Sequence, residues 1–406
     1  MINCFIPFLS LPQARQTVRA LGLCDRIKNI YLLATEKIPD EVEGCEMLMI
    51  DSPTSSATFR TIALHADTAY TLLYTKYTAF EPGQFAFERL LAIAGDTNAG
   101  MLYADRYLLK NGNSQQAPVI DYQKGSLRDD FDFGSLLFFR SSVLKQAVRA
   151  MDADYRFAGL YDLRLRVSEL AELVHVNEYL YSEAEPDTRK SGEKLFDYVD
   201  PKNRAVQIEM ESACTAYLKR VGGYLAPDFE PVTFDAGGFE QEASVIIPVR
   251  NRIRTIEDAI RSVLAQKTTF RFNLIIVDNH STDGTSEAIG KYTADGRVVH
   301  LVPERSDLGI GGCWNLGVHH PACGKFAVQL DSDDVYSGPD TLQKIVNAFY
   351  EQNCAMVVGT YRMTDFKMNE IPPGIIDHRE WTLENGRNNA LRINGLGAPR
   401  AFYTPV

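Results

Sequence analysis

The sequence lacks several features that would place the protein in a membrane or outside the cell. No run of apolar residues approaches the ~18 that a membrane-spanning helix needs. The first residues, MINCFIPFLSLPQARQ, have neither the basic start nor the small-residue cleavage site of a signal peptide. The seven cysteines are scattered without a CxxC pair, which argues against a disulfide framework or a zinc site. These absences predict a cytoplasmic protein with reduced thiols, and they leave open peripheral association with the inner face of a membrane.

Basic residues are in deficit. The chain has 42 Lys and Arg against 53 Asp and Glu, which gives a net charge of −11. A general nucleic-acid binder carries a basic surface, so we expect no nucleic-acid partner, although one local site can still hold a small anion. Two phosphate-binding signatures are missing as well. There is no Walker A motif, and a GxGxxG fingerprint would need glycine where Trp314 stands.

What is present is an ordinary soluble composition with one clear break. The 406 residues are 45% hydrophobic and 23% charged, which suits two or three domains with real cores. Residues 226–243 are rich in Pro, Gly and acids without periodicity, and this is typical of a linker. Residues 203–220 have helical spacing and are expected to close the first domain. The predicted domains are therefore 1–225 and 244–406.

Patterns of strand and helix alternate in the second domain. Short apolar runs predict strands, and apolar residues at helical spacing predict helices. The strands are expected at 244–249, 272–278, 298–302, 325–330 and 355–363, and the helices at 255–266, 285–294, 312–320 and 340–353. This alternation predicts an α/β fold with a mainly parallel sheet. Ligands of such sheets bind beyond the C-terminal ends of the strands, which is where Asp278 and the segment 331–334 fall.

The segment 331–334, DSDD, crowds three carboxylates after an apolar run. Asp331, Asp333 and Asp334 repel one another unless a cation offsets their charge. Carboxylates at a strand end suit Mg²⁺ or Mn²⁺, which can bind a diphosphate and neutralise a leaving phosphate. The alternative is a solvated acidic turn at the start of the next helix.

The first half repeats the plan of the second. Residues 2–21 and 243–262 both give a strand, Ile-Pro, a loop and a helix, and IKNIYLL matches FNLIIVD. Counting back from Pro82 and Pro339 places Tyr74, Lys76 and Tyr77 opposite Asp331, Asp333 and Asp334. The first half is therefore predicted to lack the metal carboxylates. Lys76 is expected to be structural, the alternative being a phosphate contact.

Four segments of the second half, in order, resemble glycosyltransferase family 2, the nucleotide-sugar enzymes with the GT-A fold. They are SVIIPVRNR (244–252), VDNHSTDGT (277–285), DLGIGGCWNLGV (307–318) and LDSDDVYSGPDTL (330–342). The resemblance covers about residues 244–406. It implies two α/β domains related to GT-A, the first a degenerate copy. It also implies metal-dependent sugar transfer, with inversion, from a nucleotide-diphospho-sugar to a carbohydrate or lipid-linked acceptor, as in polysaccharide biosynthesis.

The resemblance also implies a set of site residues. For the nucleotide-sugar these are Pro248, Arg250, Asn251, Asp278, Asn279, Gly309, Gly311, Asn315 and Asp331, and for Mg²⁺ or Mn²⁺ they are Asp331, Asp333 and Asp334. Arg250 stands where the family often has an aromatic residue, and it can stack on the base, reach a phosphate or simply face solvent. Asn279 stands where the family usually has Asp, so a charged acceptor is lost. Asp278 and Asn279 can alternatively serve a helix-entry turn.

The catalytic base is the missing part of the pattern. In the family it usually lies in an acidic pair downstream of a segment like GLGAPRAFYTPV (395–406), so we expect the base beyond Val406 and the chain to be incomplete at its C-terminus. The acids upstream are Asp365, Asp377, Glu380 and Glu384, none in the expected context. In the first half, Gly159 and Leu160 stand at the positions of the acidic pair.

Two other functions remain open at this level. A nucleotidyltransferase would carry a Gly-rich, Arg-containing loop after the first strand, and PVRNRIRT has arginines without glycines. A non-catalytic nucleotide-sugar-binding or scaffold protein would explain the degenerate half and the missing base. His319 and His320 are predicted to be surface residues, because neighbouring histidines on a helix point in different directions. Self-association is left open.

Overall fold

The computed structural model describes residues 1–37, 42–110, 113–184, 197–235, 237–379, 381–382, 386–393, 395–397 and 399–406. The chain divides into two compact units. Unit 1 contains Met1–Tyr224 together with Arg379–Ile393, and unit 2 contains Leu225–His378 together with Asn394–Val406. A short stretch late in the sequence therefore belongs to the first unit.

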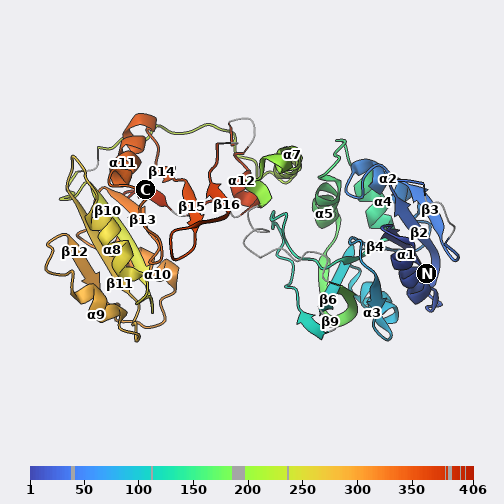
Figure 1. Ribbon diagram of the computed structural model, residues 1–406. Helices are drawn as coiled ribbons and strands as arrows, with labels where there is room; N and C mark the ends of the chain where they lie inside the picture. Colours follow the sequence, from blue (N-terminus) through green and yellow to red (C-terminus); the bar gives the residue numbers. More distant parts are fainter. Residues whose placement is uncertain are drawn as a thin grey trace. The chain divides into compact units, whose positions relative to one another are not determined.

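Unit 2 is an α/β domain whose main sheet has the strand order β12-β11-β10-β13-β17-β14 (Figure 1). Its strands are β10 (Ala243–Val249), β11 (Phe272–Asp278), β12 (Val298–Leu301), β13 (Phe326–Gln329), β14 (Met356–Val358) and β17 (Arg400–Tyr403), and its helices are α8 (Ile256–Leu264), α9 (Thr285–Gly290), α10 (Ile310–Val318) and α11 (Thr341–Gln352). The strands β10 to β13 pair in parallel, whereas β17 is antiparallel to both β13 and β14. The predicted mainly parallel sheet is confirmed.

Alternate residues of β10 face opposite sides of this sheet, as strand geometry requires. Val245 and Ile247 join a cluster with buried residues of α8 and α11. Ile246 joins the cluster beneath α10 on the other face. The helix α10 approaches closely, because a Cβ added at Gly317 would lie 2.6 Å from Ile246 Cγ2. Unit 2 thus has helices on both faces of a buried sheet.

The predicted strand at 355–363 is wrong, because the chain leaves the sheet at its middle. β14 ends at Val358, and β15 (Tyr361–Thr364) pairs instead with β16 (Glu370–Ile376) in a separate antiparallel sheet. Gly359 is the turning point, since a Cβ there would lie 2.5 Å from the Pro399 ring. Only glycine permits that approach.

Unit 1 has a mixed sheet in the order β3-β2-β1-β4-β8-β6-β9-β5, with β7 paired to β6. Its strands are β1 (Ile2–Pro7), β2 (Ile27–Ala34), β3 (Glu46–Met49), β4 (Tyr70–Tyr74), β5 (Phe80–Pro82), β6 (Met101–Lys110), β7 (Asn113–Ala117), β8 (Leu136–Arg140) and β9 (Leu173–Ala184). Its helices are α1 (Leu11–Gly22), α2 (Ser56–His65), α3 (Ala86–Thr97), α4 (Ser141–Arg149), α5 (Gly159–Leu170), α7 (Arg204–Arg220) and α12 (Asn389–Arg392), with short 3₁₀ turns at Asp197–Val199 and Pro201–Asn203. Buried residues of α1 and α3 join one core cluster, and those of α2, α4 and α5 join another.

The two sheets share six strand positions. The order β3-β2-β1-β4-β8-β6 in unit 1 corresponds to β12-β11-β10-β13-β17-β14 in unit 2, with the same parallel and antiparallel steps. Ile2 pairs with Tyr70, and Ala243 pairs with Phe326, so Tyr70 corresponds to Phe326 once Pro7 is aligned with Pro248. The sheets of the two units therefore have the same strand order and strand directions over these six strands.

This register corrects the predicted alignment by one residue. Asp331 corresponds to Thr75 rather than Tyr74, Asp333 to Tyr77 rather than Lys76, and Asp334 to Thr78 rather than Tyr77. Counting back from the prolines failed because the connection before Pro82 is one residue shorter than that before Pro339. Unit 1 still has no carboxylate at these positions.

The late segment of unit 1 is held by a buried arginine. Arg392 is fully buried and donates to Asp129 Oδ2, to Gln207 Oε1 (2.7 Å) and to Asn389 Oδ1 (2.6 Å). Asn388 Nδ2 donates to Thr215 Oγ1 on α7 at 2.6 Å. Residues 386–393 are therefore an integral part of unit 1.

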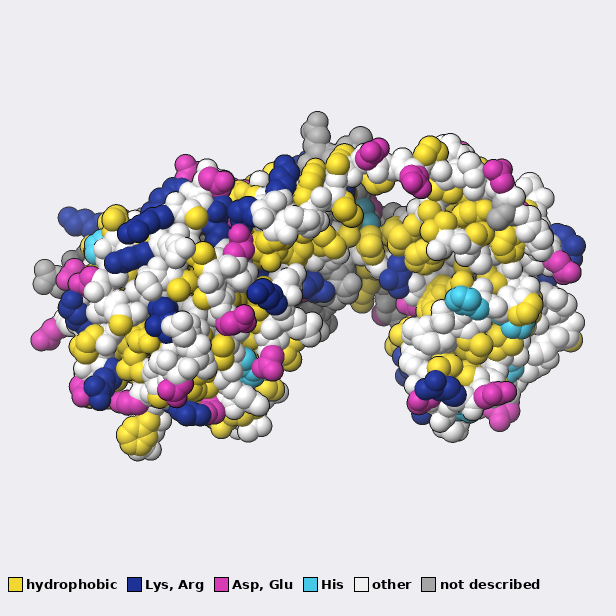
Figure 2. Space-filling view, turned by 180° about the vertical axis from the view of Figure 1, so that it is seen from behind, with side chains coloured by type: hydrophobic (Ala, Val, Ile, Leu, Met, Phe, Trp, Pro, Cys, Tyr) yellow, Lys and Arg dark blue, Asp and Glu magenta, His cyan; other side chains and the backbone are white. Residues whose placement is uncertain are grey.

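The surface carries both signs of charge. Figure 2 shows Lys and Arg as well as Asp and Glu side chains on the visible face of both units. Basic side chains are therefore present on this surface despite the net negative charge of the chain. Among the described helices, none combines the length and the apolar character required to cross a bilayer.

Candidate functional site

Three neighbouring strands of unit 2 end at the same edge of the sheet. The order β11-β10-β13 brings together the ends Asp278, Val249 and Gln329 (Figure 1). Asn279 and Arg250 follow β11 and β10 directly, and Asp331 lies two residues beyond the end of β13. The fold thus gathers the predicted segments 248–251, 277–285 and 330–334 at one edge, where parallel sheets bind ligands.

Asp278 stabilises the turn that follows β11. It is fully buried, its Oδ1 accepts from Ser281 N at 3.0 Å, and its Oδ2 accepts from Ser286 Oγ. His300 Nε2 lies 3.5 Å from the same Oδ2. Burial alone would raise the pKa of Asp278, but the hydrogen bonds from Ser281 and Ser286 outweigh it and lower the pKa below its ordinary value. Both oxygens of this carboxylate are therefore engaged inside the protein.

Asn279 presents an unused acceptor. Its Nδ2 donates to the carbonyl of Leu308, which fixes the amide and points Oδ1 away from that carbonyl. The residue is only 7% exposed, and Oδ1 has no hydrogen-bond partner among the described residues. An unpaired buried acceptor costs ~1–3 kcal/mol, so Oδ1 is available to a donor from outside the described residues.

The loop after β10 combines structural contacts with exposed arginines. Asn251 has a left-handed backbone (φ 55°), and its Oδ1 accepts from Thr282 N at 2.8 Å, which ties this loop to the turn after β11. Arg250 is exposed, and Arg252 Nε lies 3.8 Å from Asp333 Oδ2. A guanidinium therefore stands beside the carboxylate cluster.

The three carboxylates of the cluster have different surroundings. Asp331 Oδ1 accepts from Gln329 Nε2 at 3.0 Å, whereas Asp333 lies near Arg252. Asp334 keeps contact with solvent, yet partial burial, and then repulsion from Asp331 and Asp333, raise its pKa to about 6. Asp334 therefore takes up a proton at a higher pH than an ordinary carboxylate does.

The ligand atoms of the three carboxylates do not converge on one point. Among the described residues, the only group of three His, Cys, Asp or Glu whose ligand atoms lie within 4.8 Å of one another is Cys24, Asp25 and Glu88 in unit 1. A cation at the strand end of β13 would therefore take fewer than three protein carboxylates. That fits Mg²⁺, which is commonly held by one or two carboxylates together with substrate phosphates.

The start of α10 lies open. A Cβ added at Gly309 or Gly311 would meet no atom within 4 Å, so a ligand can approach this backbone. Asn315 is exposed one turn further along the helix. His319 Nδ1 contacts the carbonyl of Asn315 at 2.9 Å, and His320 Nδ1 accepts from Ala322 N at 3.2 Å. The two histidines serve the end of this helix.

Of the four candidate acids upstream of Val406, Asp365 and Asp377 lie within the described residues. Asp365 accepts from Lys367 N (2.8 Å) and Asn369 N (3.0 Å) in the turn between β15 and β16. Glu380 and Glu384 lie outside the described residues. Asp377 has interactions of its own at the end of unit 2's small sheet.

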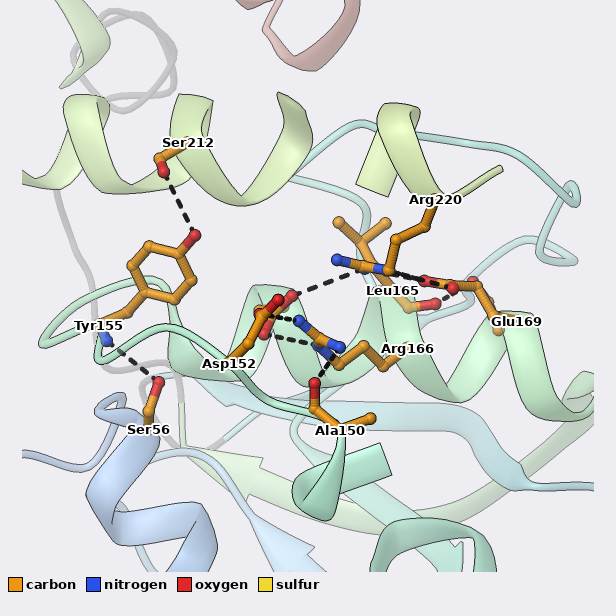
Figure 3. Close-up of polar contacts among 11 residues, drawn as sticks. Ser56, Ala150, Asp152, Tyr155, Leu165, Arg166, Glu169, Ser212 and Arg220 are labelled. Atoms are coloured by element: carbon orange, nitrogen blue, oxygen red, sulfur yellow. Dashed lines mark hydrogen bonds and ion pairs between the residues drawn. The ribbon is translucent and has the colours of Figure 1, made fainter. Parts of the chain in front are cut away.

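In unit 1, the region around Gly159 and Leu160, where the family has its acidic pair, is filled by structural contacts. A Cβ at Gly159 would lie 2.5 Å from Ser56 N, so the start of α5 packs on backbone. Arg166 Nε donates to Asp162 Oδ2 at 2.9 Å. Arg166 Nη2 also donates to Asp152 Oδ1 at 2.5 Å, and Arg220 of α7 pairs with Glu169 (Figure 3). This helix is fixed by ion pairs rather than exposed at a pocket.

Gln329 and Arg400 were not among the predicted site residues. Arg400 Nε donates to Gln329 Oε1 at 2.8 Å, and Gln329 in turn contacts Asp331. The signal that could have found Gln329 is a lone amide inside the apolar run KFAVQL. Arg400 is adjacent only through the pairing of β13 with β17, which the sequence pattern did not reveal.

The strand order and the strand ends define unit 2 as an open α/β domain with polar residues at one edge of its sheet. Residues 244–402 match the family model of glycosyl transferase family 2. The four motifs that predicted the resemblance all lie within or at the start of this matched segment.

Several known proteins are similar to parts of the chain. An uncharacterized glycosyltransferase of Rickettsia felis is 28% identical over 195 residues, which cover 43% of this chain and 32% of that protein. The putative teichuronic acid biosynthesis glycosyltransferase TuaG of Bacillus subtilis is 33% identical over 120 residues, or 30% of this chain and 46% of TuaG. The structure of S. aureus TarS 1–349 aligns with a TM-score of 0.33 at 24% identity, over 40% of this chain and 47% of that one. The chain spans less than half the length of these curated relatives.

Proposed function

We propose that unit 2 transfers a sugar from a nucleotide-diphospho-sugar to an acceptor hydroxyl, with Mg²⁺ or Mn²⁺ at the Asp331–Asp334 segment. The observation that carries this proposal is the shared edge of β11, β10 and β13. There an unpaired buried acceptor, Asn279 Oδ1, lies on one strand end and a carboxylate cluster on another. The nucleotide base of a donor needs a hydrogen-bond acceptor such as Asn279 Oδ1, and its metal-bound diphosphate needs carboxylates to hold the metal. The family match at 244–402 supports the same reaction.

In this proposal Asn279 recognises the base. Its free Oδ1 can accept from a base N–H, while its Nδ2 stays on Leu308. Asp278 acts indirectly, by holding the turn on which Asn279 sits. Pro248, Asn251, Gly309, Gly311 and Asn315 complete the proposed donor site, and Arg250 faces the base or a phosphate.

The cation would be held by one or two of Asp331, Asp333 and Asp334, and it would offset the charge that grows on the departing nucleoside diphosphate. Arg252, close to Asp333, adds positive charge on the same side. We propose attack by the acceptor hydroxyl on the anomeric carbon with inversion, while a carboxylate takes the hydroxyl proton. The acceptor is proposed to be a carbohydrate or a lipid-linked glycan.

Unit 1 is proposed to be a degenerate copy without transferase chemistry. Thr75, Tyr77 and Thr78 replace the three carboxylates, and Ala34 stands in the place of Asp278. Phenol and hydroxyl groups do not make an anionic cation site at neutral pH. The contacts at Gly159 and Arg166 support a structural role for this unit.

The test is the release of nucleoside diphosphate from a panel of UDP- and GDP-sugars with the full chain, with Mn²⁺ and with EDTA. We expect cation-dependent release. Asn279→Leu should weaken nucleotide binding about tenfold, as loss of a buried hydrogen bond does, whereas Asn347→Leu, an exposed amide on α11, should not. Binding of nucleotide sugars without any release would favour a non-catalytic binding protein instead.

A further inference from the structure

We propose that Gln329 and Arg400 form a positioning pair that orients Asp331. This inference rests on the proposed function, because it names residues that serve the same site. It starts from two polar side chains in short strands of otherwise mostly apolar sequence, FAVQ in β13 and RAFY in β17. Gln329 is 4% exposed, and burying a polar side chain costs free energy unless it is hydrogen-bonded.

The contacts run in one direction. Arg400 Nε donates to Gln329 Oε1 at 2.8 Å, and Gln329 Nε2 donates to Asp331 Oδ1 at 3.0 Å. A guanidinium can only donate and a carboxylate can only accept, so the orientation of the amide between them is determined by chemistry. Arg400 thereby turns the amide of Gln329 so that its NH₂ group points at Asp331. The hydrogen bond holds Oδ1 of Asp331 and so restricts rotation of that carboxylate.

The backbone on both sides of the pair is fixed by the sheet. Val328 pairs with Ala401, which places Gln329 and Arg400 at the next step of the same antiparallel ladder. Arg400 also pairs with Val358 of β14, so its strand is held from both edges. Asp331, in contrast, lies beyond the end of β13. Of the three residues, Asp331 is the one that the sheet does not hold, and the contacts from Gln329 and Arg400 can orient its side chain.

Unit 1 provides an internal comparison. By the register of the shared strands, Leu73 occupies the place of Gln329, and Leu137, which pairs with Leu73, occupies that of Arg400. Both leucines are 5% exposed. The same architecture is therefore built with an apolar pair in the unit where Thr75 replaces Asp331. The polar pair accompanies the carboxylate and is not required by the sheet.

Charge changes distinguish positioning from simple electrostatics. Gln329→Glu and Arg400→Met each make the neighbourhood of Asp331 more negative by one charge. Through-space attraction alone predicts that both variants bind a cation more tightly. The positioning pair predicts the opposite, because Gln329→Glu removes the donor to Asp331 and Arg400→Met frees the amide to turn. Loss of such an outer contact typically weakens metal binding about 10- to 100-fold.

The experiment is a Mn²⁺ titration of the full chain, followed by the electron paramagnetic resonance signal of free Mn²⁺, at saturating UDP and separately at saturating GDP. We expect at least about tenfold weaker Mn²⁺ binding in Gln329→Glu and Arg400→Met. Arg400→Lys should lie nearer to wild type, because an ammonium can still donate to Gln329 Oε1. Arg261→Met is the control, since this exposed arginine of α8 pairs locally with Glu257 and Asp258.

Melting temperatures of all variants show whether they fold, and if Gln329→Glu does not, the comparison of Arg400→Met with Arg400→Lys decides. If the wild type binds Mn²⁺ and the folded variants bind it equally well or more tightly, the positioning role of Gln329 and Arg400 is wrong, while the proposed cation site stands. A wild type that binds no Mn²⁺ with either nucleotide would overturn the proposed cation site and the pair together.

Discussion

Arg166 has two carboxylate partners that differ in exposure, and this difference predicts different mutational costs. The side chain of Asp162 is 1% exposed, and that of Asp152 is 78% exposed. Asp162→Ala leaves a buried guanidinium short of its partner, which typically costs ~3–5 kcal/mol. Asp152→Ala should cost less than about 1 kcal/mol, as exposed ion pairs do. Chemical denaturation of the two variants measures both free energies of unfolding, and equal losses would contradict this account of α5.

Asp334 predicts a pH dependence of the cation site. Partial burial and the neighbouring carboxylates raise its pKa to about 6, so the cation-free protein carries a proton there at lower pH. Mn²⁺ must displace this proton, and its affinity at saturating nucleotide should fall by at most about tenfold per pH unit below 6. Asp334→Asn should flatten the profile between pH 5 and 7, and a profile unchanged by that substitution would argue against the role of Asp334.

The same group has a consequence for stability with the opposite sense from most acids. Its pKa is higher in the folded protein than the ordinary value of 3.8. A raised carboxyl pKa gives a stability contribution that is complete below the ordinary value and is lost as the pH rises through about 6. Relative to Asp334→Asn, the cation-free wild type should therefore lose thermal stability between pH 4 and 7.

At the scale of elements, the close contact of α10 with β10 predicts a steric cost. A Cβ at Gly317 would overlap Ile246 Cγ2 at 2.6 Å, so Gly317→Ala should reduce the free energy of unfolding by about 1–3 kcal/mol. Gly290→Ala is the matched control, because no atom lies within 4 Å of the added carbon at the end of α9. It should be neutral or slightly stabilising. Thermal unfolding of both variants compares them, and a neutral Gly317→Ala would mean that α10 can move away.

The elements of unit 2 were largely predictable because their signals are local. The apolar run at 272–278 matches β11 at both ends, and α8 lies within the predicted 255–266. The break at Gly359 was not predictable, since it depends on Pro399, which is distant in sequence. The same holds for the Gln329–Arg400 contact, which requires strand pairing. Asp278 was found by its position, but its internal contacts with Ser281 and Ser286 were not.

At the scale of the whole molecule, Arg392 predicts that residues 386–393 contribute to the stability of unit 1. Arg392→Met leaves Asp129, whose side chain is 14% exposed, without its main partner and should cost ~3–5 kcal/mol in unfolding of this unit. Adding Asp129→Asn should recover part of the loss, because the two residues are coupled. Denaturation followed by hydrogen exchange in α7 measures the effect, and an unaltered α7 in Arg392→Met would show that the segment is dispensable.

This buried arginine also bears on how the protein is made. A ribosome delivers residues 1–224 first, yet the last side chains that complete their fold arrive only with residues 386–393. Domains usually fold in order of synthesis. Here the packing around Arg392 can be completed only after residues 225–378 of unit 2 have been translated, so the first unit is finished after much of its neighbour has been made.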